Sequence, residues 1–279
     1  MRKLLCSVLF GALFALPVST ASVEGAKLHW SSAGKGQATV ILVHGWTCDS
    51  SSWVEQIPAL SHDYRVVTLD LPGHGRSAPP KDGHFSMDLF ARAVEVVRSR
   101  VKADKVVLVG HSMGTPVIRQ YARLYPQHVA ALVLVDGLVT LPAPPPQPGG
   151  PPPQPPQMSG PEGLKARENL IRGMFTPATP PALQQHVLKM MLGAPETTAA
   201  GAMQATFDAA NWKDDVVRVP VLGIYADKSR LGNPEYSKKI FPAFEYVEIP
   251  GTGHFVMMEK PNEFNALLKA FLEKVRTES

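Results

Sequence analysis

The feature that most constrains the fold is a series of apolar, β-branched runs that recur along the chain. They occupy residues 39–43, 64–69, 106–109, 129–135, 219–225 and 246–249. Continuous apolar runs, rather than strict alternation, are typical of strands buried on both faces of a parallel sheet. Helical patterns lie between them, for example over residues 86–101, and a last helix opens at Pro261. The alternation predicts an α/β fold with a doubly wound, mostly parallel sheet.

The alternation stops between residues 137 and 215. A proline-dense stretch, LPAPPPQPGGPPPQPPQMSGPEG, comes first, and proline at this density disfavours both helix and sheet. Helix-like pieces follow at 163–174, 181–192 and 197–211, and they are rich in methionine. The methionines are either the core of this insert or an adaptable surface facing an apolar ligand. We therefore expect a core formed by residues 22–136 and 216–279, with residues 137–215 forming a Pro-rich linker and an inserted helical cap.

The N-terminus has the pattern of a secretory signal peptide. Two basic residues precede an apolar run interrupted by glycine, and Ser19-Thr20-Ala21 offers a small-residue cleavage site. An uncleaved anchor is the alternative. We expect residues 1–21 to be a signal peptide and the protein to be exported, to the periplasm or the medium, without stable membrane insertion after cleavage.

Charge and cysteine content exclude further classes. Removal of Arg2 and Lys3 would lower the formal charge from +4 to +2, and the basic residues are scattered, so no nucleic-acid partner is expected. Cys48 would be the one remaining cysteine, which leaves no intramolecular disulfide. A hydrophobic core must then stabilise the domain, and some 255 residues are enough to form one.

The sequence Gly110-His111-Ser112-Met113-Gly114 stands where an apolar run meets a helical pattern. A tight strand-to-helix turn there would project the serine hydroxyl from the sheet edge, with glycines where side chains would clash. With Gly and Ser each at roughly 7% of residues, the bare motif would arise by chance in about one chain in ten of this length. The motif therefore depends on its context.

That context includes Val43-His44-Gly45-Trp46 after the first strong strand and Gly251-Thr252-Gly253-His254-Phe255 after the last one. With these motifs, residues 27–275 resemble the α/β-hydrolase superfamily, and in particular its serine esterases and lipases with a helical lid. The resemblance implies that Ser112 is the nucleophile and His254 its base, and that the backbone N–H groups of Trp46 and Met113 form the oxyanion hole. It also implies a structural role for the loop at residues 70–77, DLPGHGRS.

The acid of the triad departs from the usual pattern. Where the family usually places it, after the penultimate strand, this chain has Ser229, which cannot carry the charge. Two carboxylates keep the chain order Ser, acid, His. Asp227 lies two residues early, whereas Asp136 ends the strand after the nucleophile's helix, a position that some superfamily members use. We favour Asp136 because a strand-end carboxylate needs no shift of the loop, and Asp227 is the alternative.

These patterns predict a secreted serine hydrolase that cleaves a carboxylic ester or related acyl compound through a Ser-His-Asp triad and an acyl-enzyme. We expect a small-molecule acyl substrate, no cofactor and no metal, since no histidine forms a cluster with metal-ligand spacing. Serine at the nucleophile position argues against the haloalkane dehalogenases and epoxide hydrolases of the family, which use a carboxylate. An amidase or peptidase, a lactonase or a perhydrolase would use the same triad. A weakly catalytic ligand sensor of the same fold is the alternative from another class.

Overall fold

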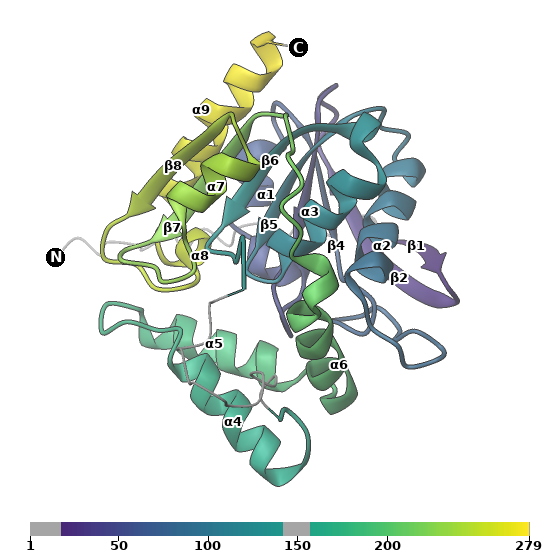
Figure 1. The fold of residues 1–279 in the computed structure, drawn as a ribbon, viewed down its shortest axis with the longest axis vertical. Helices are drawn as coiled ribbons and strands as arrows, with labels where there is room; N and C mark the ends of the chain where they lie inside the picture. Colours follow the sequence, from purple (N-terminus) through teal and green to yellow (C-terminus); the bar gives the residue numbers. More distant parts are fainter. Residues whose placement is uncertain (1–17, 142–156, 279) are drawn as a thin grey trace, which may run out of the picture.

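A computed structural model describes residues 18–141 and 157–278, which fold around one eight-stranded sheet (Figure 1). The strand order is β1-β2-β4-β3-β5-β6-β7-β8. Strands β3 to β8 are parallel to one another, whereas β2 is antiparallel to both of its neighbours, β1 and β4. The strands are β1 (Val18–Val23), β2 (Ala26–Ala33), β3 (Thr39–Val43), β4 (Arg65–Leu69), β5 (Val106–His111), β6 (Val129–Val135), β7 (Val221–Ala226) and β8 (Phe244–Ile249). The predicted doubly wound, mostly parallel α/β fold is confirmed.

The central strands form where the apolar runs predict them. β3 and β6 have the bounds expected from the sequence, and every residue of β3, β5 and β7 is buried. Helices shield both faces of these strands, so each side chain enters an apolar layer whichever way it points. The buried runs therefore form the core that positions the strand ends.

The two N-terminal strands are a difference from the sequence-based expectation. β1 and β2 pair as an antiparallel hairpin across Glu24 and Gly25, which both have positive φ, at 47° and 77°. Two positive φ angles suit a two-residue hairpin turn that follows the twist of the strands. The sequence does not predict this hairpin because its first strand overlaps residues 1–21, which have the pattern of a signal peptide. The expected cleavage boundary after Ala21 falls inside β1, and residues 1–17 lie outside the described part of the chain.

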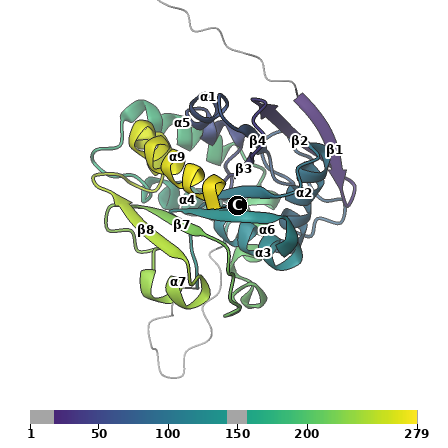
Figure 2. The same cartoon turned by 90° about the horizontal axis from the view of Figure 1, so that it is seen from above.

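Helices cover the two faces of the sheet (Figure 2). On one face α2 and α3 contact each other, and α3 lies over β5 and β6. On the other face α1 and α8 contact α9. These helices are α1 (Gln56–Leu60), α2 (Met87–Arg100), α3 (Gly114–Leu124), α8 (Val256–Glu259) and α9 (Pro261–Glu278), and α7 (Pro234–Ile240) packs beside β8. The hydroxyl of Ser86 accepts the N–H of Leu89 and caps α2, as its sequence pattern predicts.

In the described part of the segment between β6 and β7, the chain forms the α-helices α4 (Gly160–Arg172), α5 (Pro181–Leu192) and α6 (Glu196–Phe207), followed by a short 3-10 helix at Ala209–Asn211. We call residues 157–207 the cap. It lies below the carboxyl ends of the parallel strands in Figure 1. Most of the proline-dense stretch, residues 142–156, lies outside the described residues. The cap therefore stands over the edge where an open α/β sheet binds its ligands.

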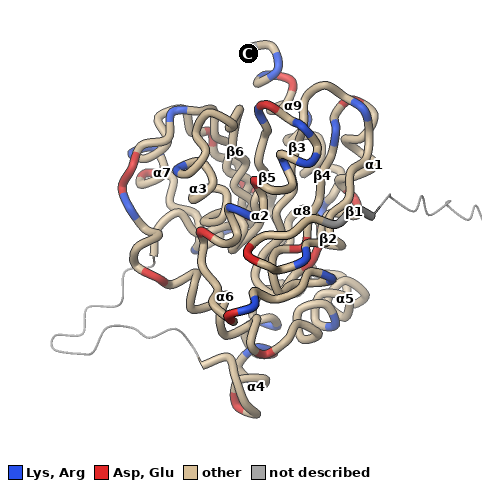
Figure 3. Tube along the Cα trace, turned by 90° about the vertical axis from the view of Figure 1, so that its right-hand side faces the viewer, with Lys and Arg blue, Asp and Glu red and all other residues tan. Residues whose placement is uncertain are grey.

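Basic and acidic residues are interspersed along the chain trace in Figure 3. Among the described residues, no helix is both long and apolar enough to cross a membrane.

Candidate active site

Ser112 occupies the sharp turn between β5 and α3. Its φ is 54°, in the left-handed region that few side chains other than glycine adopt readily. A Cβ placed on Gly110 would lie 2.4 Å from the carbonyl oxygen of Gly114, so glycine is needed where the turn closes on itself. The strained turn brings the Ser112 side chain to the wall of a cavity at the carboxyl edge of the sheet. Strain of this kind persists only where the surrounding structure enforces it.

His254 and Asp136 meet although 118 positions separate them in the sequence. His254 Nδ1 lies 2.6 Å from Asp136 Oδ2, with both side chains buried. His254 stands in the loop after β8, and Asp136 directly follows β6 with a φ of 39°. Ser112, His254 and Asp136 all line the same cavity.

The Asp136 carboxylate is held on several sides. Its Oδ1 accepts the N–H of Ala226 at 3.0 Å, and its own N–H donates to the carbonyl oxygen of Ile224. Burial acts to raise the pKa of Asp136, whereas the hydrogen bond and charge of His254 act to lower it. Hydrogen bonds from the Ser229 hydroxyl and the Ala226 N–H lower the pKa further, so it lies below its ordinary value. Asp136 is therefore an ionised carboxylate at neutral pH.

Asp227, the other candidate acid, takes a different position. Its side chain is exposed at the rim of the cavity, where Oδ2 accepts the N–H of Gly251 at 3.2 Å. Asp136 therefore contacts the imidazole of His254, whereas Asp227 binds the backbone of Gly251 in the turn that precedes His254.

Trp46 and Met113, the residues predicted to form an oxyanion hole, both lie next to Ser112 along the chain or in space: Met113 follows it directly, and a Cβ on Gly45, which precedes Trp46, would lie 3.0 Å from Ser112 Cβ. Trp46 occupies the first corner of a turn closed by the N–H of Cys48 and the carbonyl of Gly45, so its own N–H takes no part in the bond that closes the turn. Thr47 at the second corner has a φ of 52°, as type II turns require there. Met113 directly precedes α3, and an N–H at the start of a helix has no partner within the helix. Both residues line the cavity.

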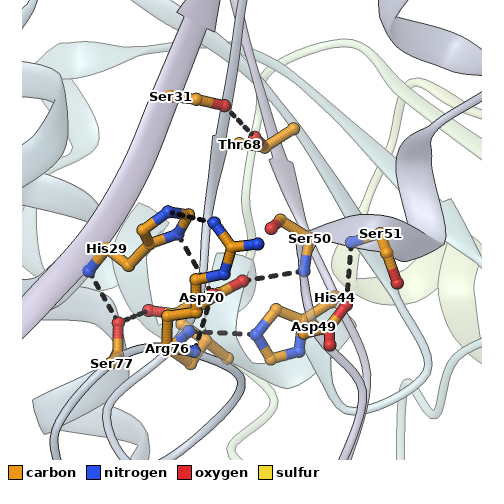
Figure 4. Close-up of polar contacts among 11 residues, drawn as sticks. His29, Ser31, His44, Asp49, Ser50, Ser51, Thr68, Asp70, Arg76 and Ser77 are labelled. Atoms are coloured by element: carbon orange, nitrogen blue, oxygen red, sulfur yellow. Dashed lines mark hydrogen bonds and ion pairs between the residues drawn. The ribbon is translucent and has the colours of Figure 1, made fainter. Parts of the chain in front are cut away.

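The loop that carries Trp46 is braced by the buried carboxylate of Asp70 (Figure 4). Asp70 Oδ1 accepts the N–H of Ser50 at 2.8 Å, and Oδ2 accepts the N–H of Arg76 at 2.9 Å. His29 Nδ1 lies 3.1 Å from the same carboxylate. One carboxylate therefore fixes the loop after β3 against the loop after β4.

His44 completes this brace in its neutral form. Its Nε2 accepts the N–H of Leu71 at 2.9 Å, which places the proton on Nδ1, where it donates to the carbonyl of Gly45. Burial lowers the pKa of His44 in spite of the nearby Asp70 charge. His44 thus orders the backbone of the turn at residues 45–48 through its bond to Gly45, and its ring is not among the residues that line the cavity.

His111 is a contact that sequence reasoning missed. Its buried Nε2 lies 2.9 Å from the backbone oxygen of His254, and the two ring centroids are 4.7 Å apart. Burial, with a contribution from the charge of His254, lowers the pKa of His111 to about 3, so the ring stays neutral and donates from Nε2. Its place beside Ser112 in the motif was the one available signal. Ser229 was likewise seen only as a missing acid, whereas its hydroxyl supports Asp136.

The cavity has a volume of about 600 Å³. The core contributes Ser112, Asp136 and His254 together with the further polar residues Asp227, Ser229, Arg230 and Thr252. The cap contributes mostly apolar side chains: Leu170, Met174, Phe175, Met203 and Phe207. Met191, by contrast, is buried inside the cap. The methionines of the insert therefore divide between packing the cap and lining the cavity. Cys48, which closes the turn at residues 45–48, is buried, and burial raises the pKa of its thiol to about 12, which leaves it unreactive.

Comparisons with known proteins agree with this architecture. Residues 38–160 match the model of the alpha/beta hydrolase fold family. The dihydrolipoyllysine-residue acetyltransferase component of the acetoin cleaving system of Pseudomonas putida is 30% identical over 273 residues, which cover 91% of this chain and 69% of that protein.

Solved structures give the same picture. A thermophilic esterase superposes with a TM-score of 0.73 at 28% identity, over 93% of this chain and 98% of the other. An esterase of Thermogutta terrifontis shares the fold with a TM-score of 0.74 at 24% identity, over 92% of this chain and 97% of the other. With its strand order, its strained serine turn and these relatives, the chain belongs to the alpha/beta hydrolase family.

Proposed function

We propose that the protein is an exported serine hydrolase that cleaves a carboxylic ester or related acyl compound. The observation that carries the proposal is the contact of 2.6 Å between His254 Nδ1 and Asp136 Oδ2 in a cavity that Ser112 lines. A serine hydroxyl becomes an effective nucleophile when a neutral imidazole removes its proton, and a carboxylate stabilises the imidazolium that forms.

In the first half of the reaction, Ser112 Oγ attacks the carbonyl carbon of the substrate and its proton passes to His254 Nε2. The carbonyl π electrons move to the oxygen, and the N–H groups of Trp46 and Met113 stabilise that oxyanion. Fixed donors need no reorganisation as the charge develops, so removal of one such donor typically slows a reaction by about 10²- to 10³-fold. Collapse of the intermediate breaks the bond to the leaving alcohol, which takes the proton from His254.

The second half returns the enzyme to its starting state. A water molecule gives a proton to His254 and attacks the acyl carbon bound to Ser112. Collapse then breaks the acyl–Oγ bond, and Oγ recovers its proton from His254 as the carboxylic acid leaves. Asp136 stays ionised throughout and keeps the Nδ1 proton of His254 in place.

The lining of the cavity favours an apolar acyl or alcohol group. Leu170, Met174 and Phe175 line it from the α4 side of the cap, and Met203 and Phe207 line it from α6. Burial of one CH₂ group contributes about 0.8 kcal/mol, so each added methylene that fits should improve kcat/KM by roughly threefold to fourfold. A methionine-rich wall can also adapt to several shapes.

The test is hydrolysis of p-nitrophenyl esters, from acetate to long acyl chains, by the wild type and by Ser112→Ala. We expect turnover that rises with chain length up to an optimum and is lost in the variant. Ala and Ser are both strained at a φ of 54°, so this substitution should leave the free energy of unfolding nearly unchanged. Equal inactivity of two folded proteins on every ester would refute the esterase proposal and direct the search to amides, lactones and ligand binding.

Export is proposed on the N-terminal pattern alone. Its test is the intact mass of the protein recovered from the periplasm and the medium. A chain beginning at Ser22 would keep only the last two residues of β1, an edge strand whose loss leaves the central strands paired. Recovery of the uncleaved chain in the cytoplasm would refute this part of the proposal.

A further inference from the structure

The loop that carries His254 is bonded to the cap through its backbone. The N–H of His254 donates to the carbonyl oxygen of Met174 at 3.0 Å, and Met174 lies between α4 and α5. A Cβ on Gly253 would lie 2.6 Å from that same carbonyl oxygen, so this approach requires glycine. The backbone of the proposed base is therefore in direct contact with the cap.

Glu259, the last residue of α8, holds both neighbours of His254. Its Oε2 accepts the N–H of Gly253 at 3.0 Å, and its Oε1 accepts the N–H of Phe255 at 3.3 Å. Hydrogen bonds to an ionised acceptor are stronger than bonds between neutral groups. A single carboxylate thus fixes the chain on each side of the imidazole.

The same carboxylate reaches into the cap. Oε2 also accepts the hydroxyl of Thr179 at 2.9 Å, and the Thr179 side chain is buried. Because an ionised carboxylate can only accept, the Thr179 hydroxyl donates its proton to Glu259, and its oxygen accepts the N–H of Thr176 at 2.9 Å. Gln184 donates to the Thr179 carbonyl from α5, so the turn that presents the hydroxyl is itself held.

We propose that Glu259 is a positioning residue that locks the His254 loop to the cap turn at residues 174–179. The orientation of the imidazole then depends on the position of the cap relative to the sheet. The cap therefore affects the reaction rate as well as the shape of the cavity. As far as it concerns reaction rate, this inference rests on the proposed hydrolase function. A displacement near 1 Å at a reacting group can slow a reaction by about 10²-fold, so a bond network at this place has a measurable effect.

Glu259→Ala removes all three bonds, and we expect kcat on the best ester to fall about 10- to 100-fold with KM changed by less than about threefold. Thr179→Val removes the bond from the cap to Glu259 and, with it, the bond that the Thr176 N–H makes inside the cap turn. It keeps both backbone bonds of Glu259 to the His254 loop and should therefore lower kcat less. Thr179→Ser keeps the hydroxyl and should restore most of the rate. Glu263→Ala is the matched control, because Glu263 is exposed on the next helix and pairs with Lys260.

A readout independent of turnover separates positioning from general destabilisation. The proton between His254 Nδ1 and Asp136 should give a low-field NMR resonance, assigned by its loss in His254→Ala. We expect this resonance to shift or broaden in Glu259→Ala and Thr179→Val, and to be unchanged in Thr179→Ser and Glu263→Ala. Should Glu259→Ala fail to fold, the two threonine variants decide the question.

An unchanged resonance with kcat within twofold of wild type in folded Glu259→Ala or Thr179→Val would overturn the proposal. Absence of ester turnover in the wild type would count against the proposed function alone, since the resonance would still report on the bonds from Glu259 to the His254 loop and to Thr179.

Discussion

Replacement of Asp136 by Asn tests the site at its most specific contact. Asn keeps the shape of the side chain but removes the charge and supplies an NH₂ group. The Ala226 N–H stands 3.0 Å from Oδ1 and can only donate, so it selects the orientation in which the amide oxygen faces it. The NH₂ group then faces His254 Nδ1 at the place where Oδ2 accepts a proton in the wild type.

This orientation reverses the tautomer of His254. With Nδ1 forced to accept, the proton moves to Nε2, which can no longer remove the proton from Ser112. In serine proteases the equivalent change lowers kcat by about 10⁴, or about 5.5 kcal/mol in the barrier, and we expect a loss of that size. Loss of the charge that stabilises the imidazolium acts in the same direction.

The assay is kcat on the best p-nitrophenyl ester for Asp136→Asn beside Asp227→Asn as a matched control. The Asp227 carboxylate accepts a single backbone N–H at the rim, so its replacement should change kcat by less than about threefold. A folded Asp136→Asn protein that retains more than a tenth of the wild-type kcat would refute the argument. A large loss in Asp227→Asn alone would assign the acid to Asp227.

Three further predictions concern strain, coupling and pH. Ser112→Gly should raise the free energy of unfolding by about 1 kcal/mol in urea titrations, since it relieves a positive φ, whereas Ser112→Ala should not. Trp46→Phe removes the indole bond to the carbonyl of Ala199 in α6 and should lower the free energy of unfolding by about 1 kcal/mol and reduce kcat. Burial lowers the pKa of His74 and of His111 to about 3, so below pH 6.5 the unfolded chain binds protons that the folded chain does not. Stability should therefore fall from pH 6.5 toward pH 3 by about 1.4 kcal/mol per pH unit for each ring, and His74→Gln should reduce that slope in urea titrations at several pH values.

Local pattern was sufficient for most of the fold. The bounds of β3, β6 and α5 follow directly from the sequence, because a run of apolar residues or a helical spacing is a property of neighbours along the chain. The hairpin of β1 and β2 escaped prediction because its first strand overlaps a segment that reads as a signal peptide. Its turn, Glu24-Gly25, also lacks the strong Asn-Gly or Asp-Gly signal.

The candidate site likewise has features that local sequence pattern predicts and features that it does not. The positions of Ser112 and His254 are marked by glycines around a turn, and such turns are local. The choice between Asp136 and Asp227 is not local, because it depends on which strand end approaches His254 when the sheet assembles. The long-range contacts of His111 and Glu259 were not predicted for the same reason. His111 Nε2 lies beside the backbone oxygen of His254, 143 positions away, and Glu259 Oε2 accepts the hydroxyl of Thr179, 80 positions away.

By itself, then, the sequence determined the sheet's central strands, the helical insert and the serine turn, since each follows from apolar spacing or from residues that favour one backbone conformation. Only the tertiary structure decided which carboxylate meets the imidazole and how the cap is joined to it. Those contacts link residues up to 118 positions apart, and their geometry is set by the packing of the sheet edge against the cap, which no window of sequence contains.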